Sequence, residues 1–214
     1  MKMSSGLDDA PLSVLLDVRH PQSYLALGPT AELGRALDIE INWLPTVVPP
    51  LNPPSLPCDE DDRGVRHRRS RAQAIAREIE TYAAAQGLVI RDYYREPDPT
   101  ALNLAWLWLR SSRPDRLGPF LSEVFRAYWA AQLDPSDSIG VARRLDAQRL
   151  DGAACLAWCR DEGPRAGAAL AGELRERGLT GATCYVVGDE VFLGRQHLPM
   201  IRWLLDGREE PGPI

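Results

Sequence analysis

The chain has 214 residues, of which 44% are hydrophobic and 26% charged, and its formal net charge is -5 at pH 7. This length suits one compact domain, or one domain with a large insertion. The negative charge argues against nucleic acid or an anionic membrane as main partner, which leaves small molecules or proteins. No apolar stretch is long enough to span a bilayer, and the first residues lack a secretory signal, so we expect a cytoplasmic protein.

The chain has four cysteines, Cys58, Cys155, Cys159 and Cys184. None forms a Cys-x-x-Cys pair, and their spacing to the three histidines matches no metal-binding motif. We therefore expect reduced, buried thiols and no metal site. For Cys155 and Cys159, four residues apart on a predicted helix, a role in packing is favoured over redox chemistry or metal binding.

Two short apolar segments, separated by a helical one, open the chain. Residues 12–18 form a run rich in branched side chains, and residues 39–45 alternate apolar and polar before a proline, so both predict strands. The segment from Pro21 onward predicts a helix with a kink or break at Gly28-Pro29. Together they form a βαβ unit, whose strands should be parallel. The proline-rich VVPPLNPPSLP then predicts an irregular loop.

Strand signals are missing from the next hundred or so residues, which predict helices. Apolar residues recur at the three-and-four spacing of a buried helix face. The predicted faces are Ala72, Ile75, Ile79, Tyr82 and Ala83, before a capping Gly87; Leu102, Ala105, Trp106 and Leu109; and Leu117, Leu121, Val124, Phe125 and Tyr128. Shorter helices are expected around 140–150, 152–159 and 164–177.

The chain returns to strand patterns near its end. Residues 183–187 and 190–193 flank Gly188-Asp189 and predict a hairpin, and residues 199–205 predict a last helix. A βαβ unit, a helical insertion and a ββα unit are the plan of a thioredoxin-like α/β fold.

The element order also predicts the division of the chain into domains. We assign residues 1–60 and 165–214 to the thioredoxin-like domain and residues 61–164 to an inserted, all-helical domain. No internal repeat appears, and no linker suggests a separate second domain.

Several motifs resemble those of one known family. The opening DVRHPQSYLA matches a D-F-x-S-P-Y-S-Y-L-A pattern at Asp17, Pro21, Ser23, Tyr24, Leu25 and Ala26. NWLP, the NPP of the proline loop, FRAYWAAQLDPSD and the C-terminal GLTGATCYVVGDEVFLGRQHLPMIRWLL resemble further patterns of that family. The chain thus resembles DsbA-type thioredoxin-fold proteins, in the branch of 2-hydroxychromene-2-carboxylate isomerases and kappa-class glutathione transferases. The resemblance covers nearly the whole chain and implies glutathione as cofactor and a homodimer.

The tetrapeptide His20-Pro21-Gln22-Ser23 aligns with C-P-x-C in the redox members and S-P-x-S in the isomerases and transferases. Thiol–disulfide exchange needs two thiols, so it is excluded at these positions. A helix N-terminus favours a thiolate, which protonated His20 can stabilise, while neutral His20 can act as a base. His20 and Ser23 are thus the candidate catalytic residues. Ser23 can supply a second hydrogen bond to the glutathione sulfur, or it can simply cap the helix.

Five further positions align with glutathione-binding residues of the family. Asn52 is unchanged, whereas Thr183 stands where the family has a cis-proline, preceded by Ala182, whose backbone would bind the ligand. A cis bond before a residue other than proline costs roughly 3–4 kcal/mol, so we expect the Ala182–Thr183 peptide to be trans unless the fold forces the cis form. Gln196 stands where the family has an acidic residue that helps hold the γ-glutamyl end of glutathione, and His197 stands where it has an arginine. Gln196 can hydrogen-bond the ammonium group of glutathione but cannot neutralise its charge.

Two more features each have two interpretations. The run RGVRHRRSR can attract an anionic substrate, but a solvated helix start balanced by the preceding acidic residues 59–62 is favoured. Tyr24, Trp106, Tyr128 and Trp129 can line a substrate pocket, although at helical spacing core packing is more common.

Two functions stay open. One is a glutathione-dependent isomerase or transferase that acts on an aromatic or electrophilic small molecule. The other is a redox-inactive thioredoxin-fold protein that binds a peptide or small molecule without catalysis. The overall resemblance and Asn52 favour the enzyme, whereas the changes at His20, Thr183, Gln196 and His197 favour the binding protein.

Overall fold

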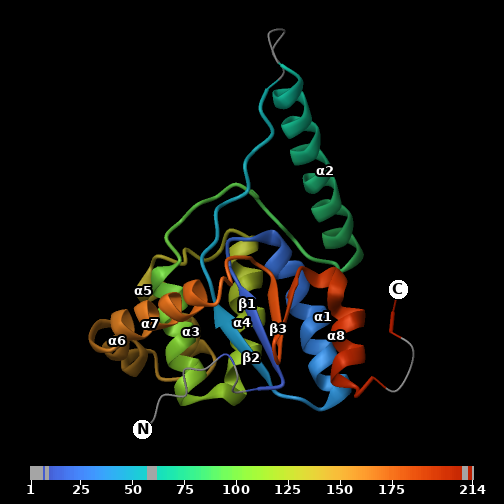
Figure 1. Ribbon diagram of the computed structural model, residues 1–214. Coiled ribbons are helices and arrows are strands. Elements are labelled where there is room, and N and C mark those ends of the chain that lie inside the picture. The colour runs from blue at the N-terminus through green and yellow to red at the C-terminus, as the bar shows by residue number, and fades with distance from the viewer. Residues whose placement is uncertain (1–6, 8–9, 57–61, 209–211, 214) are drawn as a thin grey trace.

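The computed structural model describes residue 7, residues 10–56, residues 62–208 and residues 212–213. Its centre is one four-stranded sheet with the strand order β2-β1-β3-β4 (Figure 1). The strands are β1 (Leu12–Leu16), β2 (Ile41–Pro45), β3 (Cys184–Val187) and β4 (Glu190–Leu193). β1 and β2 are parallel, while β3 is antiparallel to both β1 and β4. The predicted α/β arrangement is therefore confirmed, with strands one or two residues shorter than expected at some ends.

Both faces of the central strand β1 are buried, which explains why four of its five residues are apolar. Val14 and Leu16 belong to the larger core, with residues of α1 (Pro21–Leu37) and α8 (Leu198–Leu205). Leu15 points to the other face and packs in a second core with Leu174 of α7 (Gly163–Glu176). Because successive side chains of a strand alternate between faces, two covered faces favour apolar residues on both; the one polar residue of β1, Ser13, donates to the Leu7 carbonyl and accepts from Asn42.

Helix α1 is unbroken from Pro21 to Leu37, so of the kink or break predicted at Gly28-Pro29, the break does not occur. Pro29 has no N–H to donate to the carbonyl of Leu25, four residues earlier. The side-chain Nε2 of Gln86 donates to that oxygen instead, at 3.2 Å. A residue 61 positions away thus replaces the missing hydrogen bond, and local sequence gave no sign of it.

All described residues between β2 and β3 that have regular structure are helical, as predicted. The helices are α2 (Arg63–Ala85), α3 (Thr100–Ser112), α4 (Pro114–Trp129), α5 (Ser138–Ala147), α6 (Gly152–Asp161) and α7. Figure 1 shows α3, α5, α6 and α7 gathered on one side of the sheet and α1 with α8 on the other. Helix α3 covers the edge strand β2, where Trp106 Nε1 donates to the carbonyl of Trp43 at 3.1 Å.

Three aromatic residues of the insertion for which a substrate pocket was considered are core residues. Trp106, Tyr128 and Trp129 are fully buried, and Tyr24 of α1 stacks on Trp129 with ring centroids 6.4 Å apart. Tyr24 also packs against Phe125, at 6.1 Å. These rings join α1 to α4, so the core interpretation holds and no substrate pocket is needed to explain them.

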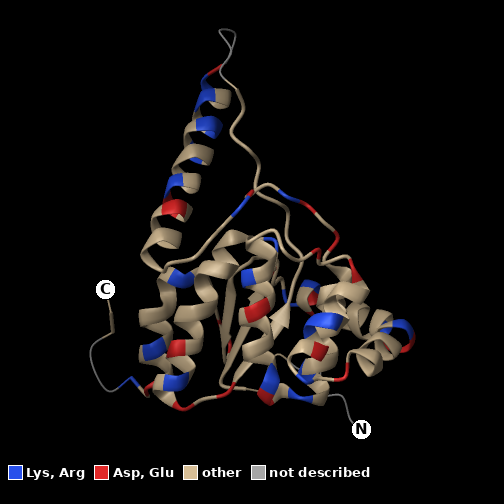
Figure 2. Ribbon diagram, turned by 180° about the vertical axis from the view of Figure 1, so that it is seen from behind, with Lys and Arg blue, Asp and Glu red and all other residues tan. Residues whose placement is uncertain are grey.

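Helix α2 projects away from the rest of the molecule and carries a series of basic residues (Figures 1 and 2). Its predicted buried face is correct only at Ile79 and Ala83, since Tyr82 is 46% exposed. The spacing of apolar residues predicts which face of a helix is apolar, but not whether another part of the protein packs against that face. The first half of α2 extends beyond the core, so its apolar residues stay partly exposed. Gly87 follows the helix with a φ of 65°, as a left-handed cap should. Among the described residues, no helix is long and apolar enough to cross a membrane.

Candidate functional site

The turn between β1 and α1 places His20 directly before the first residue of α1. The N–H of His20 donates to the Asp17 carbonyl at 3.0 Å, and the N–H of Ser23 donates to the His20 carbonyl at 2.9 Å. Pro21 occupies the first helical turn, and the His20 side chain makes no capping hydrogen bond. The backbone therefore fixes His20 at the helix N-terminus while its imidazole is free for other contacts.

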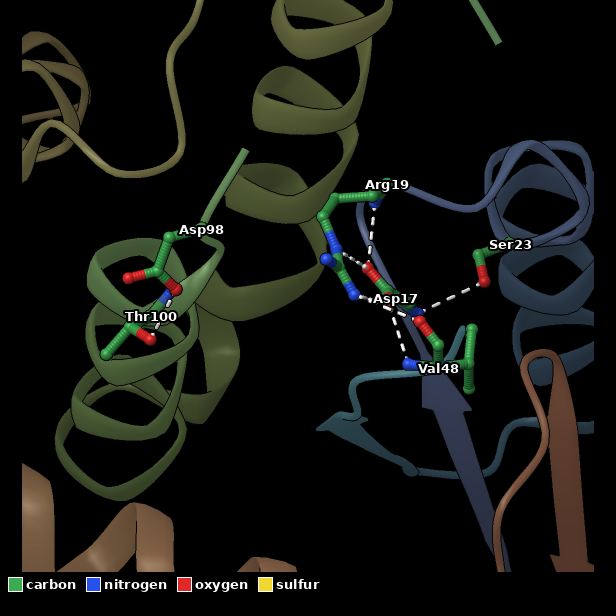
Figure 3. Close-up of polar contacts among 6 residues, drawn as sticks. All are labelled: Asp17, Arg19, Ser23, Val48, Asp98 and Thr100. Atoms are coloured by element: carbon green, nitrogen blue, oxygen red, sulfur yellow. Dashed lines mark hydrogen bonds and ion pairs between the residues drawn. The ribbon is translucent and has the colours of Figure 1, made fainter. Parts of the chain in front are cut away.

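An ion pair beneath this turn connects it to the loop after β2 (Figure 3). Asp17 is 1% exposed and Arg19 is 14% exposed, and Arg19 Nη2 lies 2.8 Å from Asp17 Oδ2. Arg19 Nε also donates to Asp17 Oδ1 at 3.1 Å. The N–H of Val48 donates to Asp17 Oδ2 at 3.0 Å, and Arg19 Nη2 donates to the Val48 carbonyl at 3.1 Å. The pair thus holds two loops together.

The charge of Arg19 also acts on Asp98, which lies just before α3. Its hydrogen bond to Asp17 raises the pKa of the Arg19 guanidinium above its ordinary value. Asp98 lies across from Arg19 in Figure 3 and accepts from the N–H of Thr100 at 3.0 Å. The hydrogen bonds from Thr100, with a smaller contribution from Arg19, lower the pKa of the Asp98 carboxyl. Sequence analysis missed Arg19, for which Asp-x-Arg at a strand end was the only signal.

Ser23 is fully buried beneath the turn. Its Oγ accepts a hydrogen bond from the N–H of Asp17 at 3.1 Å (Figure 3). That N–H lies just beyond β1 and would otherwise be a buried donor without a partner. The structure therefore gives Ser23 a clear role in holding the turn, and this role is neither the predicted capping of α1 nor the predicted catalysis.

His20 has a buried nitrogen, Nδ1, that makes no hydrogen bond to any described residue. Burial lowers the pKa of His20 below 6.5, Arg19 lowers it further, and Asp17 acts in the opposite direction. The sequence argument predicted a lowered pKa from the helix N-terminus, so its direction is confirmed but the largest cause is burial. The imidazole is therefore mainly neutral at pH 7 and has a nitrogen available to accept a proton.

The peptide between Ala182 and Thr183 is cis, so the prediction of a trans bond is wrong. That prediction counted only the local cost of the cis form. Leu15 pairs with Cys184, so the same register places Thr183 beside Leu16, at the end of β1. On its other side, the Thr183 carbonyl accepts from the N–H of Gly194 at 2.8 Å. Contacts on both sides, which local sequence does not reveal, decide the position of this peptide.

Thr183 shares one property with His20. It is 2% exposed, and its Oγ1 has no hydrogen-bond partner among the described residues. Since β3 starts beside the end of β1, the structure brings the Ala182–Thr183 peptide to the same end of the sheet as the turn before α1. Two unpartnered polar atoms thus occur at this end of the sheet.

Gln196 and His197 lie in a short 3-10 helix, η1 (Arg195–His197). Gln196 is exposed, and its Nε2 donates to the Leu193 carbonyl at 2.8 Å. The ring of His197 packs on Phe192, with centroids 5.6 Å apart. Both side chains therefore have contacts within their own segment of the chain.

Arg195, the first residue of η1, was missed by sequence analysis. Its Nη1 donates to Gln22 Oε1 of α1, and its Nη2 lies 3.5 Å from Glu78 Oε1 of α2. The guanidinium carbon stands 3.8 Å from the centre of the Tyr82 ring. This residue, whose side chain is 12% exposed, ties η1 to two helices and holds α2 at its inner end.

Asn52 lies in a different environment from the other predicted site residues. It is exposed and lines a cavity of ≈ 430 Å³ between the proline-rich loop and α2. Among the described residues that line this cavity, none belongs to the turn before α1, to β3 or to η1. The structure therefore does not place Asn52 in one cavity with the turn that carries His20.

The arginine-rich run forms the exposed start of α2. Asp62 caps this helix by accepting from the N–H of Val65 at 2.8 Å. Arg69 donates to the carbonyls of Ser55 and Leu56, at 2.8 and 2.9 Å. Arg66 and its neighbours are mostly exposed, as expected for a solvated helix start. The acidic residues 59–61 lie outside the described residues.

The described cysteines are free thiols. Cys155 and Cys184 are buried, and Cys159 is half-buried with its Sγ 3.8 Å from that of Cys155. Burial raises the pKa of the Cys184 thiol to about 11. Cys58 lies outside the described residues. Within the described part of the chain, no three His, Cys, Asp or Glu residues are grouped so that they could hold a metal ion.

No protein-family model matches the sequence, and no curated protein matches it either. The fold, in contrast, matches solved structures. One is 2-hydroxychromene-2-carboxylate isomerase, with 17% identity, a TM-score of 0.67 and coverage of 92% of this chain and 94% of that one. Another is a probable DsbA oxidoreductase from Streptomyces coelicolor, with 18% identity, a TM-score of 0.67 and coverage of 96% and 93%.

The chain has a DsbA-type thioredoxin fold. The cytosolic disulfide reductase DsbM from Pseudomonas aeruginosa is also similar, with 15% identity, a TM-score of 0.62 and coverage of 92% of this chain and 97% of that one. DsbM has been solved with GSH as well. Within this DsbA-type fold, His20-Pro21-Gln22-Ser23 follows β1 and opens α1, which is the position that the sequence resemblance predicted.

Proposed function

We propose that this protein is a glutathione-dependent isomerase or transferase for an aromatic or electrophilic small molecule, with His20 as its acid–base residue. The observation that carries the proposal is the buried, unpartnered Nδ1 of His20 at the N-terminus of α1. A buried polar atom without a partner is unusual in a folded protein, and a ligand that donates a proton or a hydrogen bond would satisfy it.

The chain's own groups fit the thiol end of glutathione. When bound, glutathione supplies a sulfur nucleophile once its thiol is ionised. His20, whose pKa is lowered, is neutral at pH 7 and can accept the thiol proton at a ring nitrogen. The N–H groups of the first turn of α1 favour negative charge at that place. Protonated His20 can then return the proton to the product.

One similar structure supports the choice of cofactor. DsbM, which has the same fold, was solved with GSH. Thr183 Oγ1, which has no partner among the described residues, provides a second polar atom at the same end of the sheet. The proposal extends to a homodimer, which the sequence resemblance implies and light scattering would test, and to a cytoplasmic location, which rests on the sequence pattern.

One observation favours the second function, a protein that binds without catalysis. The two positions that would hold the γ-glutamyl end already have contacts within the chain: Gln196 with the Leu193 carbonyl, and His197 with Phe192. If these contacts persist when a ligand binds, glutathione loses one of its anchors. The two functions therefore make different predictions for glutathione binding and for the effect of replacing His20 on the reaction rate.

Calorimetric titration with glutathione, followed by assay of its addition to an activated aryl halide, tests the proposal. We expect binding, and a rate that rises with pH through the lowered pKa of His20. His20→Ala should remove that pH dependence and about a hundredfold of the rate. His20→Ser should keep part of the rate if the residue only stabilises the thiolate.

The matched control is His67→Ala, on the exposed start of α2, which should change neither binding nor rate. Absence of glutathione binding in the wild-type protein would favour the function without catalysis. So would a His20→Ala variant with unchanged ligand binding and unchanged rate.

A further inference from the structure

The cavity that Asn52 lines lies between the proline-rich loop and α2. Its volume is ≈ 430 Å³, within the range of roughly 300–1,000 Å³ that small-molecule sites occupy. Residues 50–55 form one wall, and α2 residues from Arg68 to Ile79 form another. At about 1.5 Å per residue, this helical wall is about 16 Å long. The cavity therefore has room for an extended chain along α2.

The inner end of this cavity, towards the body of the protein, is apolar. Ile75 and Ile79 line it from α2, and Tyr93 lines it from the segment before α3. Ile79 belongs to a small core with Leu25 of α1, and Ile75 and Tyr93 pack against that core. These side chains are thus held in place by the body of the protein, and they favour an apolar group at this end.

The outer end of the cavity carries positive charge. Arg68, Arg69 and Arg71 line it from the projecting half of α2, and no described lining residue is acidic. Arg69 donates to the carbonyls of Ser55 and Leu56. Arg68 and Arg71 are exposed and form no hydrogen bond or ion pair through their side chains with any described residue. Two guanidinium groups can therefore bind an anion at this end.

The two ends together limit what the cavity can bind. The arginines repel a cation, and a small inorganic anion gains nothing from the apolar end. The charged and the apolar ends are separated by about three turns of α2. A matching ligand must therefore carry a negative charge at one end of an elongated apolar body.

We infer that this cavity binds a linear aliphatic carboxylate of the fatty-acid class, with its carboxylate at Arg68 and Arg71 and its chain along the apolar residues of α2. No residue of the turn that carries His20 lines the cavity, so the inference does not rest on the function proposed for that turn. Burial of the chain supplies most of the affinity, and the arginines supply selectivity for an anion.

Calorimetric titration with laurate and with dodecyltrimethylammonium, each below its critical micelle concentration, tests the assignment. The two probes have the same alkyl chain and head groups of opposite charge. We expect laurate to bind at a single site, and the cation to bind at least about tenfold more weakly. Equal affinities for the two probes would overturn the role of the arginines. Absence of laurate binding would overturn the whole inference.

Two double variants of α2 separate a local effect of charge from a general one. Arg68→Ala with Arg71→Ala should weaken laurate binding about tenfold, because both partners of the carboxylate are removed. The matched control is Arg66→Ala with Arg77→Ala, which removes the same charge from exposed positions that do not line the cavity, and it should bind laurate as the wild type does. Equal losses in the two double variants would overturn the assigned place of the carboxylate.

A pair of tryptophan substitutions tests the place of the alkyl chain. Ala76 lines the cavity, whereas Ala74 is exposed and does not line it. Ala76→Trp should block laurate and Ala74→Trp should not, with thermal unfolding confirming that both variants fold. Unchanged laurate binding in Ala76→Trp would overturn the location. Sedimentation of the protein with anionic phospholipid vesicles, without binding of free laurate, would also overturn the inference and assign α2 to a membrane surface.

Discussion

The turn that follows β1 and the projecting helix α2 differ in how their charged residues are held. At the turn, Asp17 is buried and Arg19 is largely buried, and both bind each other and Val48 (Figure 3). On α2, basic residues follow one another along an exposed helix (Figure 2). The run RGVRHRRSR is the more conspicuous in the sequence. Asp17 and Arg19, however, share an ion pair and hydrogen bonds with each other and with Val48.

This difference shows that burial, and not the number of charges, decides what a charged residue contributes. An exposed charge is solvated and screened, so its loss changes stability little. A buried charge depends on its partners, because water cannot replace them. Three substitutions can break or sharpen the contrast between the two regions.

The largest expected effect comes from Asp17→Ala. It leaves the Arg19 guanidinium buried without its carboxylate and removes the acceptor of the Val48 N–H. Loss of one partner of a buried ion pair costs about 3–5 kcal/mol, so urea unfolding should show a decrease of that size. The double variant Arg66→Ala and Arg71→Ala on α2 should stay within about 0.5 kcal/mol of the wild type. Equal losses in both proteins would show that the contrast is wrong.

A smaller effect is expected for Ser23→Ala. The N–H of Asp17 loses its acceptor and becomes an unpaired buried donor, which costs about 1–3 kcal/mol in unfolding free energy. Ser122→Ala is the matched control: this exposed hydroxyl donates to the Gly118 carbonyl at 3.1 Å, and its loss should change stability by less than about 0.5 kcal/mol. Glutathione affinity that falls while stability is unchanged would instead support a catalytic role for Ser23.

The smallest effect is a pH dependence caused by His20. Burial lowers its pKa in the folded state below 6.5, so the unfolded chain binds the proton more readily. The stability that neutral His20 contributes is therefore complete above pH 6.5 and is lost as the pH falls from 6.5 through the folded-state pKa. His20→Gln should remove this loss, so the variant gains on the wild type between about pH 7 and about pH 5 in urea unfolding. Parallel curves for the two proteins would contradict the buried, neutral His20.

Much of the fold could be predicted because its signals are local. The apolar run of β1, the alternation of β2 and the Gly188-Asp189 turn, where Gly188 has a φ of 57°, led to strands within two residues of those observed. The three-and-four spacing of apolar residues also predicted α3 and α4. Local sequence could not show that α1 continues past Pro29, because the hydrogen bond that compensates this proline comes from Gln86.

The candidate site could be predicted only in part. The position of His20 before α1 and the direction of its pKa shift followed from the tetrapeptide and its helix start. Arg195 was missed because its partners Gln22 and Glu78 are far away along the chain, whereas Arg19 left only the local signal Asp-x-Arg and also binds the distant Val48 carbonyl. Residues that act through long-range contacts leave no local pattern to recognise.

The sequence by itself determined which segments are strands and helices, that no Cys pair occupies positions 20–23, and that a histidine begins α1. These features depend on residues a few positions apart, where backbone geometry sets the spacing. Only the tertiary structure decided that Ala182–Thr183 is cis, that His20 Nδ1 is buried, and that Arg68 and Arg71 line a cavity with the proline-rich loop. Burial and hydrogen-bond partners are properties of segments far apart in the chain, and they exist only once those segments have packed together.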